Sequence, residues 1–102
     1  MSKHAVQVSG SSPTVIEFDL SVLAWYIRCS RNKVVKTLHE EKPGAMVNID
    51  LDAQNRVVGI ELLGVREFSV AVLKRLAPLA SKMNLNRARF VPAGHVPEET
   101  TV

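Results

Sequence analysis

Carboxylates spaced as in a calcium-binding loop are the first candidates for chemistry in this 102-residue chain. Positions one, three, five and twelve of an EF-hand loop are occupied here by Asp50, Asp52, Gln54 and Glu61. Position six, where an EF-hand has glycine, is Asn55, and the flanking residues alternate with period two instead of forming helices. A plain hairpin explains the same residues, with the acids facing solvent and Asn55 in the turn. We therefore expect a structural hairpin and no metal ligand.

Basic residues next to an aromatic side chain are the second candidate site. The set is Tyr26, Arg28, Arg31, Lys33 and Lys36, grouped around an expected turn at 30–33. Stacking aromatics beside cations are what single-stranded nucleic acid requires. A charged strand edge that resists aggregation has the same composition, so both interpretations stay open.

A single cysteine completes the inventory of reactive side chains. Cys29 could act as a nucleophile if His39 lay beside it. Strand alternation instead places Cys29 on the apolar face of Trp25 and Ile27, where a thiol is inert. The three histidines are scattered, without metal-ligand spacing. The sequence assigns no catalytic residue and no cofactor, and we expect a protein that is not an enzyme.

Composition is that of an ordinary globular chain, with 46% hydrophobic residues, 23% charged residues and a net charge of +3. The length fits one domain. No apolar run approaches the roughly 20 residues that span a bilayer, and the first residues lack the apolar region of a signal peptide. A lone cysteine fits a reducing compartment. These features predict a soluble, cytoplasmic protein without a membrane partner.

The elements that must position these residues begin with strands. Period-two alternation predicts strands over 14–20, 22–29, 33–38, 45–52 and 56–62, and weaker patterns occur at 5–8 and 88–91. Breaks between these runs are expected at 30–33, at 40–44, where Pro43-Gly44 sets a turn, and at 53–55. Because tight connections allow only antiparallel pairing, we expect a four- or five-stranded antiparallel β-meander.

After Gly64 the hydrophobic period becomes that of a helix. The pattern predicts a helix over 68–77 with Ser69 as its N-cap, interrupted by Pro78. Its apolar stripe either packs on the sheet or forms an interface with a partner. The candidate interface residues are Leu73, Leu76, Leu79 and Met83. Trp25 is expected in the core under this helix.

Together these elements predict an α+β fold, a sheet with a C-terminal helix packed on one face. The expected organisation is a flexible leader at 1–13, one domain at 14–84 and a loosely structured tail at 85–102. One helix covers only part of a five-stranded sheet, so apolar surface is left for a second chain.

Several short motifs resemble the family called domain of unknown function 2283. They are Phe18-Asp19, Trp25-Tyr26-Ile27-Arg28, Asp50-x-Asp52 and Val57-Val58-Gly59-Ile60-Glu61, within about residues 15–66. The resemblance implies a small β-meander and carries no established activity. Some family members look like partners of toxin-like proteins in two-gene cassettes, which implies an antitoxin-type role.

The function favoured by the sequence is a non-enzymatic interaction module. It would bind itself, as a homodimer, or another small protein. The alternative is a weak nucleic-acid-binding protein that uses the basic segment from Arg28 to Lys36.

Overall fold

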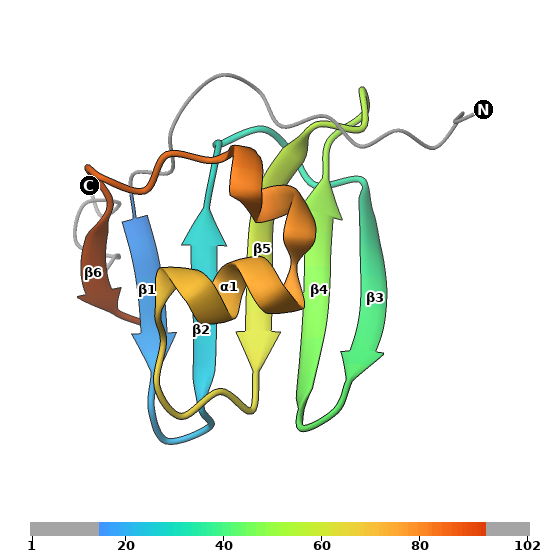
Figure 1. The fold of residues 1–102 in the computed structure, drawn as a ribbon. Helices are drawn as coiled ribbons and strands as arrows, with labels where there is room; N and C mark the ends of the chain where they lie inside the picture. Colours follow the sequence, from blue (N-terminus) through green and yellow to red (C-terminus); the bar gives the residue numbers. More distant parts are fainter. Residues whose placement is uncertain (1–14, 94–102) are drawn as a thin grey trace.

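Six strands and a short helical layer make up the part of the chain that the structure describes, residues 15–93 of a computed structural model (Figure 1). The leader expected at 1–13, the weak strand pattern at 5–8 and residues 94–102 of the expected tail lie outside the described residues. The elements, in chain order, are β1(Val15–Asp19), β2(Ala24–Arg28), β3(Lys36–Lys42), β4(Ala45–Leu51), β5(Val57–Leu63), α1(Val70–Leu76), a 3-10 helix η1(Pro78–Lys82) and β6(Arg89–Pro92).

The strands form one mixed sheet in the order β3-β4-β5-β2-β1-β6. The α+β class is confirmed, but the expectation of a four- or five-stranded antiparallel meander is wrong. β5 lies between β4 and β2, and β6 pairs with β1 in parallel. The parallel pair arises because α1 and η1 carry the chain back along the sheet, so that β6 enters in the direction of β5 and β1 (Figure 1).

No hairpin joins β2 to β3, contrary to the turn expected at 30–33. Instead residues 29–35 run across the end of β5 and β4 and deliver the chain to the far edge of the sheet. Backbone hydrogen bonds from Cys29 and Ser30 to Val58, and from Val35 to Leu51, hold this crossing segment in place. The strand expected at 33–38 therefore begins only at Lys36 and continues to Lys42, where Pro43-Gly44 makes the tight turn into β4.

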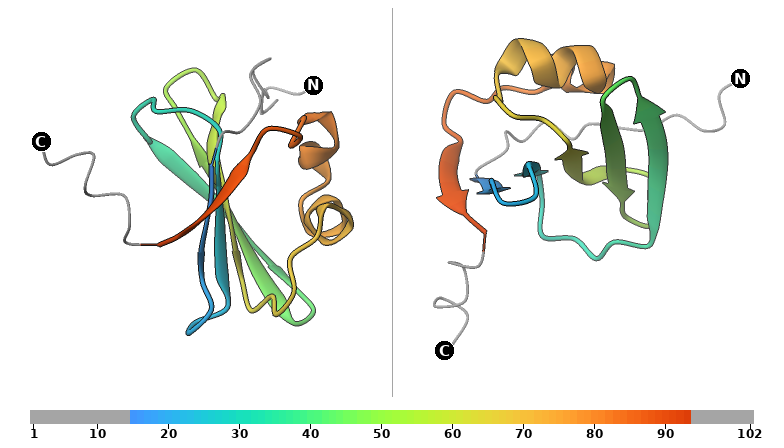
Figure 2. Two further views of the ribbon diagram at one scale, coloured as in Figure 1. Left: turned by 90° about the vertical axis from the view of Figure 1, so that its left-hand side faces the viewer. Right: turned by 90° about the horizontal axis from the view of Figure 1, so that it is seen from below.

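The helical layer covers one side of the sheet, and the other side carries no described element (Figure 2). The Ser69 side chain accepts a hydrogen bond from the Val72 backbone N–H at 3.1 Å, which confirms the expected N-cap. Pro78 ends α1 and opens η1, as its missing N–H predicts. Within residues 15–93, no helix has both the length and the apolar character that crossing a membrane requires.

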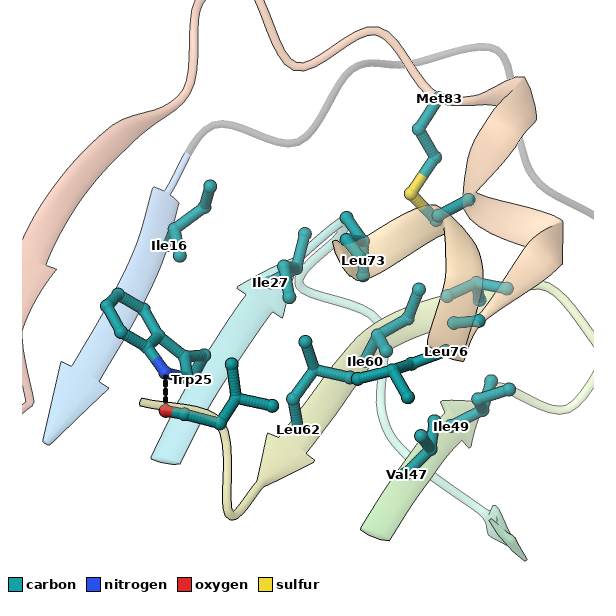
Figure 3. Close-up of a cluster of buried hydrophobic side chains, with 14 of the residues drawn as sticks. Ile16, Trp25, Ile27, Val47, Ile49, Ile60, Leu62, Leu73, Leu76 and Met83 are labelled. Atoms are coloured by element: carbon teal, nitrogen blue, oxygen red, sulfur yellow. Dashed lines mark hydrogen bonds between the residues drawn. The ribbon is translucent and has the colours of Figure 1, made fainter. Parts of the chain in front are cut away.

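The hydrophobic core lies between this layer and the sheet (Figure 3). Alternate strand residues supply one wall, and Ile27, Ile60 and Leu62 have no exposed surface. Trp25 is buried as expected, and its indole N–H donates to the Val65 backbone oxygen at 2.8 Å. Phe18, Phe68 and Phe90 surround the Trp25 ring with centroids 5.2–6.4 Å away.

The folded unit extends past the range 14–84 expected for it. β6 adds the sixth strand from within the segment expected to be a loose tail, where the sequence showed only a weak strand pattern at 88–91. Phe90 points its side chain toward the aromatic cluster, whereas Arg89 lies on the opposite face. With four residues, β6 is too short for its apolar periodicity to stand out in the sequence.

Candidate functional site

The open face of the sheet, opposite α1, is where the polar strand residues gather. Strand register arranges all the residues of this face, polar and apolar, in three rows across the sheet. The rows are Thr37, Asp50, Gly59, Arg28 and Val15; then His39, Asn48, Glu61, Tyr26 and Glu17; then Glu41, Met46, Leu63, Ala24 and Asp19.

Tyr26 is the centre of the first hydrogen-bond network on the open face. Its hydroxyl donates to Asp50 Oδ2 at 2.8 Å, and the Thr37 hydroxyl donates to Asp50 Oδ1 at 2.6 Å. The Tyr26 ring lies across Gly59, where any Cβ would overlap the ring and its hydroxyl. Burial, together with the bond to Asp50, raises the pKa of Tyr26. The phenol is therefore a fixed hydrogen-bond donor.

A second network joins β3, β4 and β5. The Asn48 amide donates to Glu61 Oε1 at 2.9 Å, and its oxygen lies 2.6 Å from His39 Nδ1. His39 Nε2 lies 3.7 Å from the Glu41 carboxylate. These contacts hold the side chains of three neighbouring strands in fixed positions.

Arg28 is engaged by its neighbours on the open face. Its guanidinium lies 3.2 Å from the Glu17 carboxylate and 5.1 Å from the centroid of the Tyr26 ring. Two of the five residues expected to bind nucleic acid, Tyr26 and Arg28, are thus brought together. They lie among the carboxylates of Glu17, Asp50 and Glu61, which repel phosphate.

The other three basic candidates lie elsewhere. Arg31 and Lys33 are exposed in the crossing segment at the end of the sheet. Lys36 is paired with Leu51, a core residue, and so lies on the covered side of the edge strand β3. The five residues do not form one patch, because the hairpin that would have joined them is absent.

The β4–β5 hairpin carries the calcium-like spacing. Asn55 has a φ of +63°, which confirms it as the turn residue. Asp52 does not face solvent as expected, since it is only 3% exposed and accepts hydrogen bonds from the turn and from Asn32. The backbone N–H of Arg56 contributes most to lowering the pKa of Asp52, to about 2. In residues 15–93, no three His, Cys, Asp or Glu side chains are grouped to hold a metal ion.

Cys29 lies on the covered side of the sheet, half-buried against Met83, whose sulfur is 4.0 Å from its own. Burial raises the pKa of this thiol to about 11. His39 lies on the open face, so the pair cannot act as nucleophile and base.

The helical stripe proposed as an interface packs into the core. Leu73, Leu76 and Met83 are 0–8% exposed, and Leu79 is half-buried against the same cluster (Figure 3). These residues are not available to a partner of the folded chain, because the sheet already covers the stripe.

Two shallow depressions adjoin each other on the open face near the β1–β2 and β3–β4 turns, and we call them together the groove. They have volumes of about 460 Å³ and 600 Å³ and share Val22 and Leu63 in their linings. Ala24 and Met46 complete an apolar floor, with Val22 60% and Met46 38% exposed. We name these four residues the groove floor. Val22 and Met46 are exposed, and Ala24 and Leu63 are half-buried between them.

Sequence reasoning missed the residues that organise this face. In the sequence, Gly59 belongs to a short motif, and Glu17 and Asn48 are polar residues of alternating strands. Nothing in the sequence indicates that they contact one another. The usable signal was a glycine inside a strand, which marks a close approach by another group. The approaching residue, Tyr26, could not be named without the strand order.

No curated protein and no solved structure matches the chain. One family model does match, described as a protein of unknown function (DUF2283), over residues 15–66, which cover β1 to β5 and the start of the connection to α1. That span is half of the chain and includes both networks and the groove floor. The chain belongs to the DUF2283 family.

Proposed function

We propose that this protein is a non-enzymatic interaction module that binds another small protein, or a second copy of itself, through the open face of its sheet. The observation that carries the proposal is an apolar groove floor on a sheet face that no described element covers. An antitoxin-like role, implied by the family resemblance, is one form of this function.

The face is better suited to binding than the sheet edges. β3 is the edge strand on one side, and charged side chains dominate it: Lys36, Glu40, Glu41 and Lys42. Charges of this kind oppose strand addition. β6, at the other edge, has four residues and ends in Pro92, which cannot donate a ladder hydrogen bond.

A pull-down from a lysate of the native host tests the proposal, with light scattering of the purified protein alone to detect self-association. The groove variant is Val22→Ser/Met46→Ser, and the matched control is Val34→Ser/Val70→Ser, which removes apolar side chains exposed to a similar degree elsewhere. We expect the groove variant to bind roughly tenfold more weakly, about 1.4 kcal/mol, and the control to bind as the wild type does. Equal retention by both variants would contradict the proposal.

Nucleic-acid binding is the second candidate. The observation in its favour is that Asn32 bonds to Asp52 and so holds the exposed Arg31 and Lys33 beside the turn that carries Arg56. Nuclease treatment of the same pull-down separates the two functions. Material released by nuclease, with affinity that falls steeply with salt, would support this candidate over the open face.

A further inference from the structure

Charge is segregated between the two sides of the molecule. The open face has more carboxylates than guanidinium groups: Glu17, Asp19, Glu41, Asp50 and Glu61 against Arg28 and Arg89. The chain as a whole carries a net charge of +3, so its basic residues lie mainly elsewhere. α1 shows the opposite sign, since its charged residues are Lys74 and Arg75.

The acids of the open face border the groove. Glu17, Asp19 and Glu61 line one depression, and Glu41 lines the other. The two basic residues in the same linings already have acidic partners, because Arg28 pairs with Glu17 and Lys42 pairs with Glu40, each at 3.2 Å. The groove is therefore an apolar floor with an acidic rim, the rim being Asp19, Glu41 and Glu61.

Two of the three rim carboxylates, those of Asp19 and Glu61, are held in place by neutral donors, whereas Glu41 is exposed beside His39. Asp19 accepts from the Ser21 backbone and hydroxyl, and Glu61 accepts from the Asn48 amide. These donors are neutral, so they orient the carboxylates without cancelling their charge. Side chains ordered in advance lose less entropy when a partner binds.

The charge pattern decides between kinds of partner. In a symmetric dimer the same patch lies on both sides of the interface, so an open-face dimer would bring one acidic rim against another. Phosphate groups of nucleic acid would meet the same repulsion. A partner with lysine or arginine around apolar side chains would match both the rim and the floor.

We infer that the open face binds a basic amphipathic segment of another protein, with its apolar side chains on the groove floor and its cationic side chains at the acidic rim. This inference rests on the proposed function and narrows it to a complex with a different, positively charged protein.

The test uses a synthetic peptide of alternating lysine and leucine, and a counterpart with glutamate in place of each lysine. Binding to the full chain is followed by calorimetry and by two-dimensional NMR. We expect the lysine peptide to bind at least about tenfold more tightly, with the largest shift changes at Ala24, Met46 and Leu63. Equal affinity for the two peptides, no binding of the lysine peptide, or shifts confined to α1 would overturn the inference.

Matched variants separate the acidic rim from general charge. Glu41→Gln removes one exposed rim charge, whereas Glu67→Gln removes one exposed carboxylate that lines neither depression. Glu40 is kept in both variants, because it pairs with Lys42 in the lining of the groove. The rim variant should bind the lysine peptide about fivefold more weakly and the control within about twofold of the wild type. Equal weakening would overturn the inference. A host protein that binds through the groove floor with acidic residues would also overturn the inference of a basic partner. That result would still support the proposed function.

Discussion

The two faces of this sheet are built from alternate residues of the same strands, yet they are held together differently. On the covered face, Ile27, Ile60 and Leu62 are packed against the helical layer with no exposed surface. On the open face, Tyr26, Asp50 and Asn48 are ordered by hydrogen bonds at partly exposed positions. Burial of an isoleucine or leucine is worth about 1.5–3 kcal/mol, whereas a typical hydrogen bond contributes about 1 kcal/mol net. The covered face therefore supplies most of the stability, and the polar side chains of the open face contribute less.

The largest expected effect comes from the covered face. Leu73→Ala should lower the free energy of unfolding by about 2–5 kcal/mol, because a fully buried side chain leaves a cavity between α1 and the sheet. Val70→Ala, at a residue of the same helix that is 43% exposed, should cost less than about 1 kcal/mol. Urea unfolding followed by circular dichroism measures both. Similar losses would mean that the two sides of α1 do not differ in burial.

A smaller effect is expected from the open face, at Gly59. Gly59→Ala should cost about 1–3 kcal/mol, because its methyl group displaces the Tyr26 ring and breaks the bond to Asp50. In a Tyr26→Ala background the same substitution should cost less than about 0.5 kcal/mol, since the clash is gone. Urea unfolding of the four proteins in this cycle gives the coupling. Equal costs in both backgrounds would show that the Tyr26 ring is not the reason why position 59 requires glycine.

The last prediction concerns how the stability of the fold changes as the pH falls, through the carboxylate of Asp52. The folded-state pKa of Asp52, about 2, lies below its ordinary value of 3.8. The carboxylate therefore stabilises the fold above about pH 4, and this contribution is lost as the pH falls toward 2. Thermal melts from pH 5 to pH 2 should fall less steeply for Asp52→Asn than for the wild type. Parallel curves would contradict the hydrogen-bonded turn.

Local features of the fold could be predicted from the sequence. The β4–β5 hairpin, the Ser69 cap and the break at Pro78 each depend on residues only a few positions apart. Trp25 was predictable as a core residue because alternation alone assigns its face. These features depend on short-range geometry, which a single sequence displays directly.

Strand order could not be predicted, because it depends on contacts between distant residues. The turn-like residues 30–33 suggested a hairpin, but hydrogen bonds to Val58 and Leu51 hold this segment as a crossing. The same limit applied to the site. The sequence placed Tyr26 and Arg28 on one face correctly, while their partners Asp50 and Glu17 come from strands whose positions depend on that order.

The family match ends at residue 66, before the helical layer that covers the sheet begins. The five strands within it have one apolar face, and the layer that covers this face begins only at Val70. A chain ending at residue 66 would expose Ile27, Ile60 and Leu62 to water, and β1 would become an unpaired edge. The end of the family match therefore does not coincide with the end of the folded unit. Residues 67–92 supply the helical layer and the edge strand that bury this surface, so a truncated chain would expose to self-association the residues that the whole chain uses as its core.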